Sequence, residues 1–281
     1  MKYRSPNFTN RVSIMTQANT VNRRQILGGL GALSAFGALS LLGCGSEDKS
    51  STTSSSTDTS SSSSSSSTNS SSSSSSSTTI NGNCAIIPTE TIGPYPLLAF
   101  LSNSSVRRQD VTEGKTGVLL TVKLKIVNVN DSCKPIANTA VYIWHCDKDG
   151  QYSGYSSGQN GNHANETFLR GVQVTDDNGE VTFTTIYPGW YAGRITHIHF
   201  QVYLANNLNV SAIATSQMAF PQDITKVVYN SSLYSSRGQN TSVTSFSADN
   251  IFSDGTSYQM TTVTGDVTNG FVASLTAGIA A

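Results

Sequence analysis

Apolar and polar side chains alternate along residues 117–127, where the polar positions are Thr121, Lys123 and Lys125. Because successive side chains of a strand point to opposite faces of a sheet, this period of two predicts a half-buried β-strand. The apolar face of that strand consists of Val118, Leu120, Val122, Leu124 and Ile126. Shorter β-like runs follow, and glycine, asparagine, aspartate and serine separate them. They predict strands at 141–144, 171–175, 181–186, 197–204, 213–220, 259–263 and 271–279.

Turn signals indicate how these strands connect. Asn178 and Gly179 lie between the runs 171–175 and 181–186, so we expect these two strands to pair as a hairpin. No segment after residue 44 carries the stripe of apolar positions that is typical of a helix. Many short strands with turns between them are typical of an antiparallel β-sandwich or barrel, so the expected fold class is mainly β.

Residues 1–44 have the pattern of an export signal. Arg23 and Arg24 precede an apolar run at 26–42 that contains several glycines and leads into the sequence LLGC at Cys44. A membrane-spanning helix needs about 20 apolar residues, and this run is shorter. The paired arginines indicate twin-arginine export, and LLGC resembles the lipobox of bacterial lipoproteins, which implies that Cys44 is acylated. An uncleaved membrane anchor is the alternative, and both place the domain outside the cytoplasm, in the periplasm or at the cell surface.

Residues 45–83 are mostly serine and threonine. The stretch 50–79 has no apolar residue, so it cannot bury enough surface to offset its ordering entropy. We therefore predict a disordered tether at 45–83, with a glycosylated stalk as the alternative, and a single folded domain at 84–281. The formal net charge of +0 lacks the basic excess of nucleic-acid-binding proteins, so we expect no nucleic-acid partner.

The chain has 4 cysteines. If Cys44 carries lipid, Cys84, Cys133 and Cys146 remain, and one disulfide with one thiol is the simplest partition of three. The sequence does not select the pair. A disulfide between Cys84 and Cys133 would leave Cys146 as a small buried apolar residue within the sequence WHCD.

Two histidines lie two residues apart in the expected strand at 197–204. In a strand, His197 and His199 project from one face, together with Gln201 and Tyr203, while the apolar residues between them face the core. Imidazole nitrogens at this spacing can bind one metal ion, and imidazole suits zinc, copper, iron and nickel. The alternative is a pair of buried histidines with a packing role.

Tyrosines, and not carboxylates, accompany these histidines. Tyr152 in GQYSG and Tyr191 in PGWYAG both lie in glycine-containing turns that let a side chain reach inward. A phenolate is a hard anionic donor, but its ordinary pKa of about 10 must fall steeply, and a trivalent cation has that effect. Because the chain has 11 tyrosines, a hydrogen-bonded packing role is the alternative for each.

Four segments, in this order, resemble the intradiol ring-cleavage dioxygenases, the superfamily of catechol 1,2- and protocatechuate 3,4-dioxygenases. They are ETIGPYP at 90–96, VYIWHCDKDGQYSGY at 141–155, FLRGVQVTDDNGEVTFTTIYPGWY at 168–191 and GRITHIHF at 193–200. The resemblance spans residues 84–281 and implies an antiparallel β-sandwich of the intradiol dioxygenase core type. It also implies one Fe(III) per site, with the ligands Tyr152, Tyr191, His197 and His199.

The resemblance implies roles for further residues. Arg194 is expected to lie against the substrate ring and to stabilise charge that develops there, with a surface arginine as the alternative. Gln217 is expected near the substrate, or else is an ordinary polar strand residue. Pro94 and Tyr95 are expected to line one wall of the substrate pocket. Tyr191 is expected to act as a base for a substrate proton once the substrate displaces it.

The implied function is cleavage of a catechol-type ring by O2, between the two hydroxyl-bearing carbons, to a muconate-type dicarboxylate. This is an exported activity of aromatic compound catabolism, with a catechol-type molecule and O2 as partners and the membrane reached through the lipid anchor. The chain lacks a long insertion between Tyr191 and His197, so we expect an open site. The oligomeric state is not predicted. A non-catalytic binding module and a zinc or copper site on the His-x-His strand are the rival hypotheses.

Overall fold

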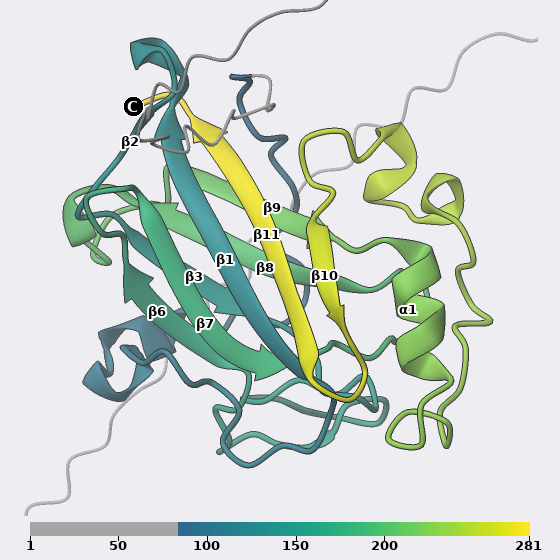
Figure 1. Ribbon diagram of the computed structural model, residues 1–281. Coiled ribbons are helices and arrows are strands. Elements are labelled where there is room, and N and C mark those ends of the chain that lie inside the picture. The colour runs from purple at the N-terminus through teal and green to yellow at the C-terminus, as the bar shows by residue number, and fades with distance from the viewer. Residues whose placement is uncertain (1–83) are drawn as a thin grey trace, which may run out of the picture. The chain divides into compact units, whose positions relative to one another are not determined.

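The computed structural model describes residues 84–281, which form two β-sheets packed face to face (Figure 1). The first sheet contains β1 (Leu119–Asn128), β2 (Lys134–Pro135), β7 (Glu180–Ile186), β10 (Thr262–Asp266) and β11 (Gly270–Ile279). The second has the order β6 (Arg170–Val174), β3 (Ala140–Trp144), β8 (His197–Tyr203) and β9 (Ala214–Ala219). The predicted mainly-β sandwich is confirmed. The export signal 1–44, the lipidation site Cys44 and the tether 45–83 lie outside the described residues.

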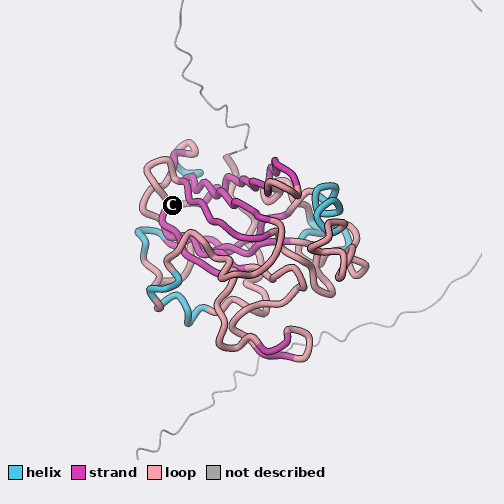
Figure 2. Tube along the Cα trace, turned by 60° about the horizontal axis from the view of Figure 1, so that its bottom comes forward, coloured by secondary structure: helices cyan, strands magenta, loops and turns pink. Residues whose placement is uncertain are grey.

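Helical segments lie at the margins of these sheets (Figure 2). One α-helix, α1 (Gln222–Tyr229), follows β9. The 3-10 turns are η1 (Leu98–Ser102), η2 (Ser104–Val106), η3 (Val129–Asp131), η4 (Leu204–Asn206), η5 (Phe246–Ala248) and η6 (Phe252–Asp254). A two-stranded ribbon of β4 (Ser156–Ser157) and β5 (Gly161–Asn162) completes the described elements. Within residues 84–281, no helix has the length and apolar character needed to cross a membrane.

The period of two along β1 determines which side chains enter the core. The five predicted apolar residues of this strand are all buried, with at most 2% of any side chain exposed. They pack against Ile143, Phe183 and Phe200 from three other strands, so the core lies between the sheets. Fully burying a side chain of this size contributes about 1.5–3 kcal/mol, so this layer holds the two sheets together.

The predicted hairpin of 171–175 with 181–186 is wrong, although both strands and the turn exist. Asp176 makes the turn, because its Oδ1 accepts hydrogen bonds from the amides of Asn178 and Glu180, both at 2.9 Å. However, β6 pairs with β3 in the second sheet and β7 pairs with β1 in the first. The turn therefore carries the chain from one sheet to the other. A local turn signal specifies a reversal of direction and does not specify the partner strand.

Three further features differ from the predictions: the pairing of one strand, the start of another and a short helix. β1 pairs in parallel with β11, whereas the other pairs of named strands are antiparallel. β10 begins at Thr262, later than the expected run 259–263. The expectation of no helix after residue 44 is wrong at α1. That helix buries only Thr225, Val228 and Tyr229, and such a short stripe is a weak periodic signal.

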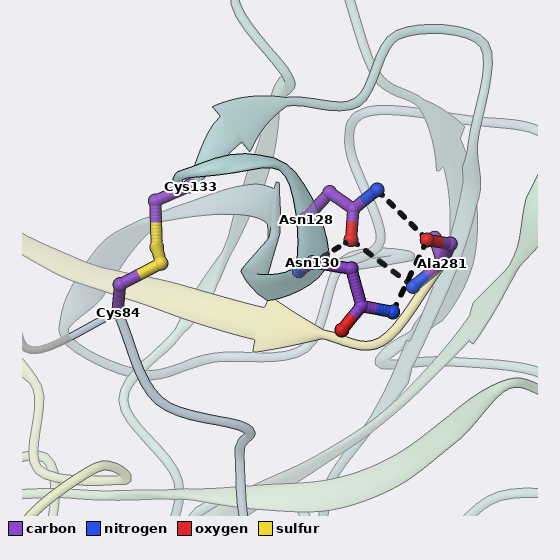
Figure 3. The surroundings of a disulfide bond; sticks show 5 residues. All are labelled: Cys84, Asn128, Asn130, Cys133 and Ala281. Atoms are coloured by element: carbon purple, nitrogen blue, oxygen red, sulfur yellow. Dashed lines mark hydrogen bonds between the residues drawn. A yellow bond between two sulfur atoms is a disulfide. The ribbon is translucent and has the colours of Figure 1, made fainter.

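A disulfide joins Cys84 to Cys133, which is the pair that leaves Cys146 free and buried (Figure 3). The C-terminal residue is tied to the same region. The Asn128 side-chain amide donates to the Ala281 carbonyl at 2.8 Å, and the Ala281 amide donates back to Asn128 Oδ1 at 3.2 Å. The first and last described residues are therefore both fastened beside the end of β1.

Candidate functional site

His197 and His199 lie on β8, which is buried on both faces between β3 and β9. Their Nε2 atoms are 3.1 Å apart. His197 Nδ1 lies 2.6 Å from the Ile195 carbonyl, which can only accept, so Nδ1 carries the proton and Nε2 has a free lone pair. The Trp144 ring stacks on the His199 ring at 4.8 Å with an interplanar angle of 3°. The two imidazoles are thus fixed as a pair on one face of the strand.

Tyr152 projects from a turn that a carboxylate and an amide hold in place. Asp147 Oδ1 accepts from the amides of Asp149 at 3.0 Å and Gln151 at 2.9 Å, which shapes the turn. The Asn160 side chain binds the main chain of Tyr152 at two points. Its Oδ1 accepts from the Tyr152 amide at 2.6 Å, and its Nδ2 donates to the Tyr152 carbonyl at 2.7 Å. The Tyr152 side chain is 1% exposed, and its hydroxyl has no hydrogen-bond partner among the described residues.

Tyr191 comes from a second loop, which is in direct backbone contact with the first. The Gly189 amide donates to the Asp147 carbonyl at 3.1 Å. A Cβ at Gly189 would lie 2.3 Å from the Lys148 carbonyl oxygen, so only glycine allows the loops to approach this closely. The Tyr191 hydroxyl lies 3.2 Å from His197 Nε2, and the rings of Tyr191 and Tyr152 are 5.7 Å apart.

The structure therefore brings together the four residues that the sequence singled out, Tyr152, Tyr191, His197 and His199. Among residues 84–281, no group of three or more His, Cys, Asp and Glu side chains could hold a metal ion. A metal at this place would consequently need phenol oxygens in addition to the two imidazoles. The donor set fits a hard trivalent cation, and the buried hydroxyl of Tyr152 without a partner is the atom that such a cation would satisfy.

Burial controls the protonation of these four groups. It lowers the pKa of His197 and of His199 well below the ordinary value, so both imidazoles are neutral, as metal ligands must be. It raises the pKa of Tyr191 to about 12 and the pKa of Tyr152 well above its usual range. Without a cation both phenols are therefore protonated at neutral pH.

Arg194 lies in the loop just before β8, and its side chain is buried beside the imidazoles. Its Nη1 is 3.4 Å from His197 Nε2, and its Nη2 donates to Gln217 Oε1 at 2.6 Å. Gln217 is fully buried on β9, opposite His199 in the register, and its Nε2 donates to the Thr91 carbonyl at 3.2 Å. Both residues thus lie beside the imidazoles, and they contact each other.

The segment 90–96 lies over the site. Gly93 has a φ of 73°, and a Cβ there would be 2.9 Å from His199 Cε1, so the main chain rests directly on the imidazole. The Tyr95 ring stacks on the Tyr152 ring at 4.9 Å and lies edge-on to Tyr155 at 5.1 Å. Pro94 lies between these contacts and is exposed to solvent. One wall of the site is therefore an aromatic surface.

A cavity of about 470 Å³ lies beside α1, and the predicted site residues do not line it. Its walls include Ile195, Thr196, Phe220, Tyr229 and Val243. It is therefore distinct from the site, although Ile195 and Thr196 connect Arg194 to His197. The candidate site is recognised by its donor atoms and not by this volume.

Sequence reasoning missed several residues that build the site. Trp144, Asp147 and Asn160 fall within or near the motif at 141–155, where their position beside Tyr152 could have suggested a supporting role. Asp249 is different. It binds Arg194 from the segment between α1 and β10, which carries no pattern, and nothing in the sequence distinguishes it among 17 acidic residues.

Known proteins similar to this chain share one kind of activity. The family model described as Dioxygenase matches residues 93–263. A solved intradiol ring-cleavage dioxygenase from Tetranychus urticae is 28% identical, with a TM-score of 0.60 over 70% of this chain and 95% of that chain. A second solved dioxygenase is 28% identical, with a TM-score of 0.59 over 70% and 94% of the two chains. No curated protein matches the chain. The matched residues 93–263 include the four candidate ligands, Arg194 and Gln217.

Proposed function

Because the chain belongs to the intradiol ring-cleavage dioxygenase family, we propose that it cleaves a catechol-type ring with O2 between the two hydroxyl-bearing carbons, yielding a muconate-type dicarboxylate. The family membership makes it an oxidoreductase. The observation that carries the proposal is the convergence of two phenols and two imidazoles in one buried site. Both oxygen atoms end in the product, since each newly formed carboxyl group takes one of them.

We assign Tyr152, Tyr191, His197 and His199 as the ligands of one Fe(III). The two neutral imidazoles, the unpartnered hydroxyl of Tyr152 and the hard character of phenol oxygens support this assignment. When bound, a ferric ion supplies Lewis acidity toward a chelating catechol. The protein contributes the fixed geometry. The stacking of Trp144 sets the ring of His199, and the Ile195 carbonyl sets the tautomer of His197.

The two tyrosines differ in exposure, and this difference assigns their roles. Tyr152 is buried and held through its main chain by Asn160, whereas Tyr191 is only partly buried. Tyr191 is therefore the phenol that can move to admit a substrate. Held as the phenolate by a bound ferric ion, Tyr191 could then accept a substrate hydroxyl proton at its Oη, which lies 3.2 Å from His197 Nε2, and become a neutral phenol.

Arg194 provides a fixed positive charge beside the reacting ring. Its Nη1 points toward His197, and Gln217 holds its Nη2. Preorganised donors of this kind stabilise negative charge that develops during reaction, and removing one commonly costs about a hundredfold or more in rate. The aromatic wall of Tyr95 and Tyr155 suits a flat ring.

We also propose that the enzyme works outside the cytoplasm, anchored through acylated Cys44 after twin-arginine export. The sequence pattern of residues 1–44 supports this, and the Cys84–Cys133 disulfide suits an oxidising compartment. Mass spectrometry of the mature N-terminus tests it. A diacylglyceryl group on Cys44 is expected, and an unprocessed N-terminus would contradict the proposal.

Metal analysis combined with a visible spectrum and oxygen uptake tests the proposed reaction. We expect about one iron per chain, a tyrosinate-to-iron charge-transfer band that shifts when a catechol is added, and O2 consumption with catechol, protocatechuate or hydroxyquinol. A non-catalytic binding module would bind a catechol without consuming O2. A colourless zinc protein, or a protein that holds copper and no iron, would overturn the iron assignment.

A further inference from the structure

Asp249 is the most heavily hydrogen-bonded carboxylate at the site, although it comes from a segment without strands. Its side chain is fully buried between η5 and η6. Oδ2 accepts from Arg194 Nε at 3.0 Å and from the Ile195 amide at 2.7 Å. Oδ1 accepts from the amides of Ile251 at 2.8 Å and Phe252 at 3.1 Å. Each oxygen has at least two donors, so the carboxylate is satisfied and rigidly placed.

This placement fixes the guanidinium of Arg194 at two points. Nε donates to Asp249, and Nη2 donates to Gln217 at 2.6 Å from a different strand. Because the guanidinium is a rigid plane with five donors, fixing two of its nitrogens also fixes the third. That third nitrogen, Nη1, faces His197 Nε2 at 3.4 Å. The Phe252 ring lies 5.7 Å from the guanidinium carbon and limits its movement further.

The fixed orientation of the guanidinium plane is important because the proposed role of Arg194 depends on where its charge lies. Arginine has many rotamers, and a displacement of about 1 Å of a reacting or stabilising group can cost about a hundredfold in rate. Asp249 also accepts from the amide of Ile195, so it holds the main chain of the loop that enters β8. One carboxylate therefore sets both the side chain of Arg194 and the backbone that follows it.

We propose that Asp249 is a positioning residue that aims the Nη1 donor of Arg194 at the ring-cleavage centre by holding Nε and the Ile195 amide. The proposal rests on the proposed function and goes beyond it, because it assigns part of the catalytic geometry to the segment between α1 and β10. Asp249 acts through Arg194 and does not touch the reacting atoms.

A double-mutant cycle tests this dependence. Asp249→Asn keeps the shape of the side chain but cannot accept as a carboxylate, so we expect kcat for oxygen uptake to fall about tenfold or more with a smaller change in KM. In an Arg194→Met background, the same Asp249→Asn change should have no further effect on kcat, although it should still lower Tm. Asp254→Asn is the matched control, since Asp254 is exposed in the same segment and should leave kcat unchanged.

A second measurement uses metal-free protein and needs no turnover. Heteronuclear NMR should show the Arg194 Nε–H as a slowly exchanging resonance, assigned by its absence in Arg194→Met. We expect this protection in the wild type and in Asp254→Asn, and its loss in Asp249→Asn. A merely structural role for Asp249 predicts an equal loss of kcat in both arginine backgrounds, and that result would overturn the proposal.

The two measurements also separate this proposal from the proposed function. If wild-type protein loaded with iron consumes no O2 with any catechol while Arg194 Nε–H is protected, the ring-cleavage function is wrong and Asp249 is a structural partner of Arg194 alone. If oxygen uptake is normal but Asp249→Asn leaves both kcat and the Nε–H resonance unchanged, the function stands and the positioning role is wrong.

Discussion

The Nε2 atom of His197 lies 3.1 Å from the Nε2 atom of His199, and the remaining ring nitrogen of His197 is committed to a backbone carbonyl. Two neutral imidazoles that face each other at this distance share at most one proton. Burial keeps the pKa of both histidines well below the ordinary value, so neither imidazole becomes positively charged near neutral pH. Both Nε2 atoms face one point, and neutral imidazoles so placed suit a pair of ligands to one metal ion.

Tyr152→Phe should separate metal binding from folding. The Tyr152 hydroxyl is buried without a partner, and removing such a group relieves a desolvation cost of about 1–3 kcal/mol. We therefore expect the metal-free variant to be as stable as the wild type or about 1 kcal/mol more stable in urea unfolding. The same variant should lose iron and the charge-transfer band. A clear loss of stability in the metal-free variant would show that the hydroxyl has a structural partner.

Gly189→Ala should damage the contact between the two tyrosine loops. The added Cβ would meet the Lys148 carbonyl oxygen at 2.3 Å, and backbone cannot yield as a flexible side chain does. We expect a loss of about 1–3 kcal/mol in the free energy of unfolding and a weaker iron band. Gly158→Ala is the control, because nothing lies within 4 Å of its Cβ and both measurements should match the wild type. Equal behaviour of the two variants would contradict the close approach.

Acid should destabilise the metal-free protein partly through His145. This side chain is fully buried, with Nε2 2.7 Å from Thr185 Oγ1 and Nδ1 2.8 Å from the Cys146 carbonyl, and burial lowers its pKa to about 4. The folded pKa lies below the unfolded value of 6.5, so the unfolded state binds the proton first. The stability is complete above pH 6.5 and is lost as the pH falls through 4.

Over that window the pKa difference of His145 corresponds to about 3 kcal/mol, at about 1.4 kcal/mol per unit. His145→Gln should reduce the pH dependence of the urea unfolding free energy between pH 6.5 and 4 by an amount of this order. Its absolute stability at pH 7 is expected to be lower, since two hydrogen bonds change. A variant whose slope equals that of the wild type would show that folding does not lower the pKa of His145.

The Cys84–Cys133 disulfide should stabilise the domain through its unfolded state. It closes a loop with a sequence separation of 49, for which loss of chain entropy contributes about 4 kcal/mol. We expect Cys84→Ser, Cys133→Ser and the double variant to lower the free energy of unfolding by similar amounts, and a reducing agent to lower the Tm of the wild type only. Additive losses in the two single variants would indicate that each cysteine acts separately.

The sequence predicted strands where local periodicity is strong and failed where the partner is distant. The alternation of Val118 to Ile126 specified β1 and its buried face, because the pattern is a property of the strand itself. The pairing of β1 with β11 joins segments far apart in the chain, and the turn at Asp176 carries no information about which sheet comes next. Helix α1 was missed because it buries only three residues.

The site residues likewise divide into those that a local motif identifies and those that depend on distant contacts. The spacing of His197 and His199 on one strand pointed to a metal site, whereas Tyr152 and Tyr191 were named through the resemblance to the dioxygenase family. The structure brings these four together. Asp249 could not be named, because its role depends on a contact with Arg194 that is 55 residues distant and on burial that no local pattern encodes. Residues that support a site through long-range contacts are therefore identified only from the structure, whereas short motifs identify the residues that carry the chemistry.

The covalent link at Cys84 also determines how force reaches the domain. A pull on the chain before Cys84 passes through the sulfur bridge into the loop after β1, whose strand is the centre of the first sheet. Residues 90–96, which rest on the His199 imidazole, follow that junction along the chain, so the disulfide takes part of a pull before it reaches them. A tether attached before Cys84, as we propose, would therefore transmit its pull to the first sheet as well as to the segment 90–96.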